Sequence, residues 1–297
     1  MRQTIKCNNC DSTNYQILYE ESIAQIHKIV KCKDCGLMYA IPLEIDQLEI
    51  VGEGEVSAKT LKTAFASNFS SIVDQKEKIQ IRDYLSSIKY VEKINPMKGT
   101  ALEIGSSHGY FLHELEKRGW DVTGIEPSKN RREIANRLFG YQLVPDKLED
   151  SNLPENFFNA IFLFHVIEHV LDPSDFISIL YKYLKPGGLL VVETPTYDTL
   201  TYKILRHRER SIKSNGHLFF FTKNNLRKIM EKKGFTTLKH IRVGRTLTLE
   251  RLFWNISKII NNEKIDKYLL KICLILKLNR VKIHLNMGDM QRIYCKK

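Results

Sequence analysis

The chain has 297 residues, of which 43% are hydrophobic and 27% charged. This is the composition of a globular protein, and it excludes a disordered tail, a collagen-like fibre and a small disulfide-rich scaffold. Apolar runs such as residues 160–170 are interrupted by His or Glu well before the ~18 residues that a membrane helix needs. The first residues lack the apolar core of a signal peptide. We therefore expect a cytoplasmic protein without a membrane span.

Charge is distributed unevenly along the chain. Residues 1–200 carry 22 Lys/Arg against 28 Asp/Glu, a net charge of −6, whereas residues 201–297 carry 24 against 6, a net charge of +18. A cationic third of the chain predicts an anionic partner, such as a phosphate-bearing acceptor, a nucleic acid or an anionic membrane surface. A solvated, lysine-rich surface is the alternative, and composition does not decide between the two.

Four of the six cysteines form two Cys-x-x-Cys pairs separated by 21 residues, Cys7 with Cys10 and Cys32 with Cys35. Two such knuckles can place four thiolates tetrahedrally around Zn²⁺. Gly36 suits the tight turn of a knuckle, and disulfides are not expected in a cytoplasmic chain. The pattern predicts a zinc ribbon over residues 1–43. Its Zn²⁺ is structural, since a four-cysteine site leaves no open position for catalysis.

Residues 44–98 are predicted to form a linker followed by a helical cap. Gly52 and Gly54 stand among acidic residues, which is typical of a linker or mobile lid, and apolar residues over 61–94 recur at mixed helical spacing.

From residue 100 onward, short apolar strands alternate with amphipathic helices. Strands are predicted at 101–104, 122–125, 160–164, 189–193, 235–243 and 283–294, and helices at 110–118, 129–139, 174–184 and 223–233. Such alternation predicts a doubly wound α/β sheet whose ligand lies at the carboxyl ends of the strands. We assign residues 99–246 and 281–297 to this domain and expect inserted basic helices at 247–280.

The loop after the first of these strands carries a glycine motif. Gly105 lets the chain turn out of the strand, and Gly109 lets the next helix start close to a ligand. Glu126 closes the second strand about 20 residues later, where it can accept both ribose hydroxyls. With Glu103 two positions before the first glycine, the pattern fits S-adenosylmethionine better than NAD. The candidate cofactor residues are Glu103, Gly105, Ser106, Ser107, Gly109, Tyr110, Glu126 and Asp146.

Five blocks in this order resemble the class I S-adenosylmethionine-dependent methyltransferases, namely residues 102–112, 124–128, 165–173, 184–188 and 193–195. The resemblance covers most of the chain and implies a seven-stranded, Rossmann-like methyltransferase sheet. Ser107 stands where the family loop usually has a third glycine, and Glu103 where aspartate is common, which changes cofactor affinity without removing it. Asn159 replaces an aspartate that commonly opens the fourth strand, and this departure concerns packing more than chemistry.

Together with the ribbon, the chain is further similar to bacterial methyltransferases of sugar and surface-glycan biosynthesis. This resemblance implies methyl transfer to a saccharide hydroxyl or carbon on a nucleotide- or lipid-linked precursor.

His165, Glu168 and His169 follow the strand at 160–164, and His217 resembles the histidine that returns to this site in the same families. A hydroxyl that attacks a sulfonium methyl must lose a proton, and a neutral histidine accepts it at physiological pH. We expect His165 or His217 to be the base. The alternative is that Glu168 and His169 only fix the turn by hydrogen bonds.

The same residues resemble the divalent-metal site of small-RNA 2′-O-methyltransferases, whose motif reads Glu-Val-Ile-Glu-His with a distant histidine. His165 stands in place of the first glutamate, so Mg²⁺ would lose one of the hard oxygen ligands that it prefers. The sequence therefore disfavours a catalytic metal without excluding it.

The sequence favours methyl transfer from S-adenosylmethionine to a sugar or glycan precursor in surface polysaccharide biosynthesis, with a phosphate-bearing small-molecule acceptor. RNA 2′-O-methylation and a non-catalytic, methyltransferase-like binding module are the alternatives. A nucleic-acid partner is disfavoured because the chain has no aromatic-rich platform for single strands. The inserted helices are expected to cover the sheet. Peripheral membrane contact through the basic C-terminal third stays open.

Overall fold

The computed structural model describes residues 6–20, 28–41, 69–206, 216–249 and 281–297, together with Ile212 and Leu252. The linker glycines Gly52 and Gly54 and nearly all of the segment 247–280 lie outside the described residues. Within the described part of the chain, no helix is long and apolar enough to span a membrane.

The central sheet has the strand order β5-β4-β6-β7-β10-β9. Its strands are β4 (Thr100–Ile104), β5 (Asp121–Ile125), β6 (Phe158–Phe164), β7 (Leu184–Pro195), β9 (Thr236–Thr248) and β10 (Lys282–Lys296). The strands β5, β4, β6 and β7 are parallel, whereas β10 runs antiparallel to β7 and β9. The predicted doubly wound α/β fold is confirmed.

The seventh strand position is occupied by a single bridge. Val144 pairs in parallel with Ile125 of β5, so among the described residues six strands and this bridge stand in place of the predicted full seven-stranded sheet. β9 continues to Thr248, beyond its predicted end at residue 243, because it pairs with β10 as far as Lys282. The first two residues of the segment predicted as inserted helices are therefore strand.

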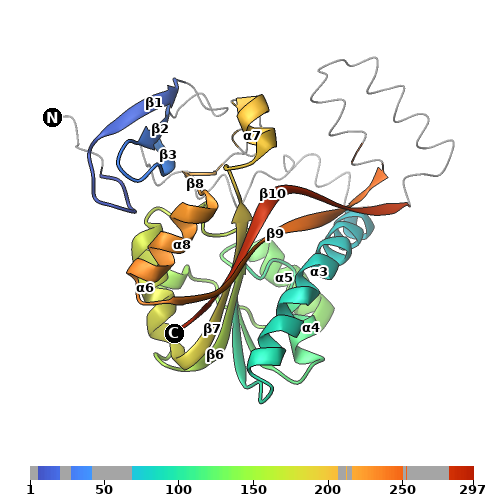
Figure 1. The fold of residues 1–297 in the computed structure, drawn as a ribbon. Coiled ribbons are helices and arrows are strands. Elements are labelled where there is room, and N and C mark those ends of the chain that lie inside the picture. Colours follow the sequence, from blue (N-terminus) through green and yellow to red (C-terminus); the bar gives the residue numbers. More distant parts are fainter. Residues whose placement is uncertain are drawn as a thin grey trace.

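Helices cover both faces of the sheet (Figure 1). α3 (Phe69–Ile94), α4 (Tyr110–Glu116) and α5 (Lys129–Phe139) lie on one face, and α6 (Pro173–Tyr183) and α8 (Lys223–Lys232) lie on the other. α6 shows why such segments become helical. Asp172 caps it by accepting the backbone N–H of Asp175, Pro173 occupies its first turn, and Phe176 and Leu180 form its buried stripe. Two short helices, η2 (Leu148–Asp150) and α7 (Leu200–Leu205), lie in connecting segments.

β6 is apolar on both faces because helices cover both. Ile161 and Leu163 belong to the core cluster under α6 and α8, whereas Ala160 and Phe162 belong to the cluster under α3 and α4. This alternation follows from the two-residue period of a strand.

The N-terminal residues form a smaller antiparallel sheet in the order β1-β2-β3-β8. Its strands are β1 (Tyr15–Tyr19), β2 (Lys28–Cys32), β3 (Met38–Ile41) and β8 (Phe219–Phe220). β3 pairs with β2 on one side and with β8, from the segment before α8, on the other. The ribbon is therefore joined to the large domain by strand pairing as well as by the chain, as Figure 1 shows at the upper left.

Asn159 connects the amino ends of three strands. Its Oδ1 accepts hydrogen bonds from the Thr100 backbone N–H (3.1 Å) and from Lys185 Nζ (3.0 Å). These strand ends lie at the opposite edge of the sheet from the carboxyl ends where a ligand binds. The role predicted for this position, packing more than chemistry, agrees with these contacts.

Replacing Asn159 by Ala removes this acceptor and leaves the partly buried N–H of Thr100 without it. We expect the free energy of unfolding to fall by about 1–3 kcal/mol, measured by denaturant titration. Asn159→Asp is the matched control, because it keeps the acceptor and places a carboxylate beside Lys185. Equal losses in the two variants would contradict this account.

Candidate functional site

A cavity of about 660 Å³ opens at the carboxyl ends of β4, β5 and β6, where the fold predicts a ligand. Its volume is in the ordinary range for small-molecule sites. Residues from α3, from η2 and from β9 complete its wall, among them Gln80, Ile81, Tyr84, Leu148, Asp150 and Arg245.

The loop between β4 and α4 forms one side of this cavity. Gly105 has a φ of 74°, and the backbone N–H groups of Gly105 and Ser106 both donate to Ile125 O at 2.9 Å. A Cβ atom at Gly105 would lie 2.8 Å from Val166 Cγ2. The position therefore requires glycine both for its left-handed backbone and for the space.

Glu126 organises the loop that it faces. It is buried and lines the cavity. Its Oε2 accepts the Ser107 N–H and its Oε1 accepts the Ser128 N–H, both at 2.9 Å. Each carboxylate oxygen retains lone-pair capacity for a further donor such as a ribose hydroxyl. The sequence predicts a ligand role for Glu126 but gives no sign of this structural one.

Six of the eight candidate cofactor residues line the cavity, namely Glu103, Gly105, Ser106, Ser107, Tyr110 and Glu126. Gly109 and Asp146 do not. Gly109 precedes α4 with a φ of 79°, and a Cβ there would lie 3.0 Å from Tyr141 Cδ2. Its glycine is explained by packing and backbone conformation. Asp146 stands one residue before the lining segment Lys147–Asp150.

The turn after β6 carries the candidate catalytic residues. His165 adopts a positive φ of 57°, which is uncommon for a residue with a side chain and concentrates at functional sites. Its backbone N–H donates to Glu193 O at 2.9 Å. Its Nδ1 lies 3.4 Å from Glu168 Oε1, and Glu168 Oε2 accepts the Thr194 hydroxyl at 2.8 Å.

Glu168 is buried with 1% of its surface exposed. Burial by itself would raise the pKa of this carboxyl, but the imidazoles of His165, His169 and His217 outweigh it and lower the pKa to about 2. Glu168 is therefore a carboxylate at physiological pH. An ionised acceptor beside His165 Nδ1 favours a proton on that nitrogen, which leaves Nε2 as the basic atom of the neutral ring.

His169 has the same tautomer for a different reason. Its Nδ1 lies 2.8 Å from Gly216 O, and because a carbonyl only accepts, Nδ1 must be the donor. The ring of His217 packs edge-on against His169 with centroids 4.8 Å apart. His165 and His169 line the cavity, whereas His217 does not. The four candidate residues are thus brought together, with two of them facing the cavity.

Ligand atoms of Glu168, His169 and His217 lie within 4.8 Å of one another. One carboxylate oxygen and two imidazole nitrogens suit a divalent transition metal better than Mg²⁺. A catalytic cation is therefore compatible with the geometry, and chelation experiments must address it.

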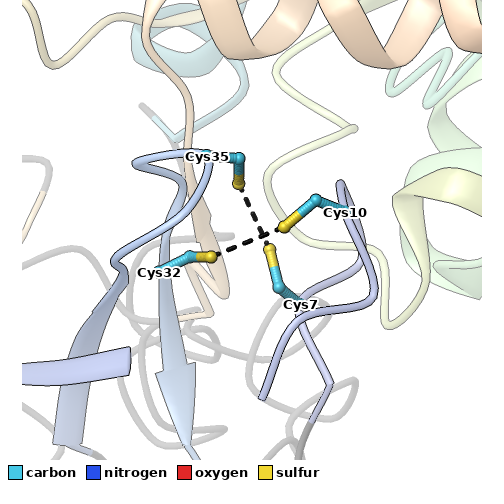
Figure 2. A group of neighbouring side chains, drawn as sticks. All are labelled: Cys7, Cys10, Cys32 and Cys35. Carbon is cyan, nitrogen blue, oxygen red and sulfur yellow. Dashed lines mark hydrogen bonds between the residues drawn. The ribbon is translucent and has the colours of Figure 1, made fainter. Parts of the chain in front are cut away.

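The four cysteines predicted to bind zinc also converge (Figure 2). Cys7 and Cys10 come from one loop and Cys32 and Cys35 from the other, with Sγ···Sγ distances of 3.5 Å between Cys7 and Cys35 and between Cys10 and Cys32. Four thiolates at ~2.3 Å around a tetrahedral Zn²⁺ would stand ~3.8 Å apart. The hydrogen bond between the two thiols lowers the pKa of Cys35 to about 5 and raises the pKa of Cys7, so one thiol of this pair is favoured as the thiolate that binds metal. This donor set fits a structural zinc ion.

Sequence reasoning missed the wall of the cavity that α3, β6 and β9 form together. Tyr84 and Phe164 stack with centroids 4.0 Å apart, and Arg245 forms an ion pair with Asp289. These residues come from α3, β6 and β9, which are far apart in sequence, so no local spacing marked them. Only the acidic and apolar run Leu148-Glu149-Asp150 offered a signal, one turn downstream of Asp146.

Comparison with known proteins is consistent with this geometry. A family model described as "Methyltransferase domain" matches residues 76–240. The tRNA U34 carboxymethyltransferase of Hydrogenovibrio crunogenus is 28% identical over 179 residues, which cover 54% of this chain and 54% of that protein. The ubiquinone biosynthesis O-methyltransferase of Alkalilimnicola ehrlichii is 29% identical over 110 residues, covering 34% and 43%. This chain spans about half the length of the curated tRNA relatives that it matches.

Among solved structures, a SAM dependent methyltransferase from Archaeoglobus fulgidus superposes with a TM-score of 0.52 at 18% identity, covering 77% of this chain and 100% of that one. At this identity the likeness supports the fold alone.

We predict that Gly105→Ala abolishes S-adenosylmethionine binding, because the new Cβ closes on Val166 and displaces the loop. Gly140→Ala is the matched control. Gly140 has a similar φ of 76°, yet a Cβ there meets nothing within 4 Å, so both variants carry the same backbone strain of ~1–2 kcal/mol. Calorimetric titration with the cofactor separates them. Equal affinity in the two variants would contradict the assignment of the loop.

Purified protein is expected to contain one zinc ion per chain, and Cys32→Ser is expected to lose it. Cys295→Ser removes a buried thiol of β10 outside the cluster and should retain the metal. Metal analysis of the three proteins, purified without chelator, measures this. A zinc-free wild type would disprove the site.

Proposed function

The chain belongs to the class I S-adenosylmethionine-dependent methyltransferases, since the matched methyltransferase domain spans more than half of its length, and we propose that it methylates a hydroxyl of a sugar or glycan precursor. The observation that carries the proposal is the pair formed by His165 and buried Glu168 just after the carboxyl end of β6, in which His165 lines the same cavity as the cofactor loop.

S-adenosylmethionine supplies, when bound, an electrophilic methyl group on a sulfonium centre. Glu103, Ser106 and Glu126 are the residues that would hold it, because they line the cavity beside the glycine loop. His165 takes the proton of the acceptor hydroxyl on Nε2 as the oxygen attacks. Glu168 keeps Nδ1 protonated and stabilises the imidazolium that results.

The acceptor side suits a small polar ring. Tyr84 and Phe164 provide an aromatic wall against which the apolar face of a sugar can pack. Arg245 adds a cationic group from β9, which is compatible with the phosphate of a nucleotide- or lipid-linked precursor. Walls of this kind, apolar with a few placed polar groups, are typical of small-molecule sites.

RNA methylation is the second candidate. Some of the curated relatives, such as the one from Hydrogenovibrio crunogenus, are named tRNA U34 carboxymethyltransferase, and the cluster of Glu168, His169 and His217 could hold a divalent cation. The basic C-terminal third would then contact the phosphate backbone.

Methyl transfer from radiolabelled S-adenosylmethionine to nucleotide sugars, to lipid-linked glycans and to total RNA tests the two candidates in parallel. Label in a sugar fraction supports our proposal, provided that any rate lost to EDTA, which can also remove the ribbon zinc, is not restored by Mn²⁺ or Mg²⁺. Label confined to RNA, or turnover that EDTA abolishes and Mn²⁺ or Mg²⁺ restores, supports the second candidate and refutes the first.

We expect His165→Ala to lower kcat by ~10²–10⁴ while cofactor affinity changes little, because the cofactor loop is held by Ile125 and Glu126. His284→Ala is the control, since that histidine lies near Asp83 outside the cavity. Glu168, with its pKa of about 2, is ionised at the neutral pH of the comparison. Full turnover by His165→Ala would rule out this base.

A further inference from the structure

We propose that the zinc ribbon positions the histidine cluster of the active site through residues 216–219, so that zinc in the ribbon controls the methyl-transfer step and not cofactor binding. The chemical step in this statement rests on the proposed function. The structural coupling can be tested without it.

Leu218 connects the two parts of the molecule with its own backbone. Its N–H donates to Glu168 O at 2.8 Å, and its carbonyl accepts the N–H of Ala40 in β3 at 2.8 Å. One residue is thus bonded on one side to the catalytic turn and on the other to the ribbon. A shift of β3 relative to the sheet would move the peptide that contacts Glu168.

The neighbours of Leu218 fix the catalytic turn at further points. Gly216 O accepts the Nδ1 proton of His169 at 2.8 Å, and the Phe219 N–H also donates to Glu168 O, at 3.2 Å. The tautomer of His169 and the main chain of Glu168 therefore depend on where residues 216–219 lie. His217 belongs to this same segment.

The ribbon packs closely against residues 216–219 and the start of α8. Phe219 and Tyr39 are fully buried and stack with ring centroids 6.3 Å apart, and both belong to one core cluster with Cys7 and Cys32. Nδ2 of Asn225 donates to Cys35 O at 2.8 Å, which ties the start of α8 to the second knuckle. β2 ends at Cys32 and β3 begins three residues after Cys35, so the metal-binding turn sets the position of β3.

Zinc binding to such knuckles supplies folding free energy to the ribbon. Without the ion, four thiols that lie within 4.8 Å of one another have no cation to organise them, and β3 loses its anchor. The cofactor loop is held by hydrogen bonds to Ile125 at the end of β5. In the sheet, β4 and β6 separate β5 from β7. Loss of zinc should therefore loosen residues 216–219 and spare the loop after β4.

Hydrogen exchange monitored by mass spectrometry on the full chain tests this coupling. In Cys32→Ser, the peptide containing Leu218 and Phe219 should exchange about tenfold faster or more, while the peptide over residues 102–112 exchanges as in the wild type and calorimetry gives unchanged cofactor affinity. Cys295→Ser is the matched control and should show neither change. Asn225→Ala, which retains every cysteine, should keep zinc and show a smaller acceleration in the same peptide.

Unchanged exchange at residues 216–221 in zinc-free protein overturns the proposal. Loss of cofactor binding together with faster exchange also overturns it, because zinc would then support the whole fold.

Once an acceptor is known, kcat should fall in Cys32→Ser with an unchanged cofactor Kd, and added Mn²⁺ or Mg²⁺ should not restore it. If those ions restored kcat, the metal needed for turnover would bind at the cluster that contains Glu168 and not in the ribbon. If no acceptor is methylated by the wild type, the proposed function fails while the exchange result still decides the coupling.

Discussion

A buried carboxylate at Glu168 is the constraint around which this site is built. An unpaired charge in a protein interior is strongly unfavourable, so a side chain with 1% exposure must be surrounded by compensating groups. Thr194 from the end of β7, two histidines from its own turn, and His217 from beyond α7 supply them. Three segments distant in sequence have to converge for Glu168 to stay ionised. The active-site geometry is a consequence of that requirement.

A second buried carboxylate, Glu193, has its charge compensated by a guanidinium instead of imidazoles, and its role is structural. Burial raises its pKa, and the guanidinium of Arg292, whose Nε lies 2.6 Å from Oε2, opposes the rise. Arg292 also donates to Asp83 O of α3, so the pair ties β7, β10 and α3 together. Glu193 O in turn accepts the N–H of His165. This ion pair lies among the strands and supports the turn after β6 through the carbonyl of Glu193, whereas in the pair of His165 and Glu168 the His165 side chain lines the cavity.

Much of the fold could be predicted because its signals are local. The helix at Lys129–Phe139 matches its predicted bounds, and the strands β4 to β6 lie within two residues of theirs. β8 could not be predicted, since a two-residue strand has no periodicity and exists only because β3 lies beside it.

The candidate site likewise combines residues marked by local patterns with residues brought in by tertiary packing. Cys-x-x-Cys spacing and the Gly105 loop are local patterns, but the contributions of Tyr84 and Arg245 depend on tertiary packing. Gly109 shows the converse, because this residue of a local pattern does not line the cavity, and a Cβ there would lie 3.0 Å from Tyr141 Cδ2.

The position of the ribbon can be understood from the low local stability of connecting loops. Catalytic residues at strand ends stand on connections that lack the cooperative hydrogen bonding of the sheet below them. Residues 216–219 form such a connection, and the side of it away from Glu168 would face solvent without β3. A small segment buries too little apolar surface to be rigid by packing alone, and metal ligation compensates for that deficit. The ribbon extends the shared core over Leu218 and Phe219 and supplies a strand for β8. Under our proposal, a cysteine cluster with no open coordination position influences proton transfer without contacting a reacting atom.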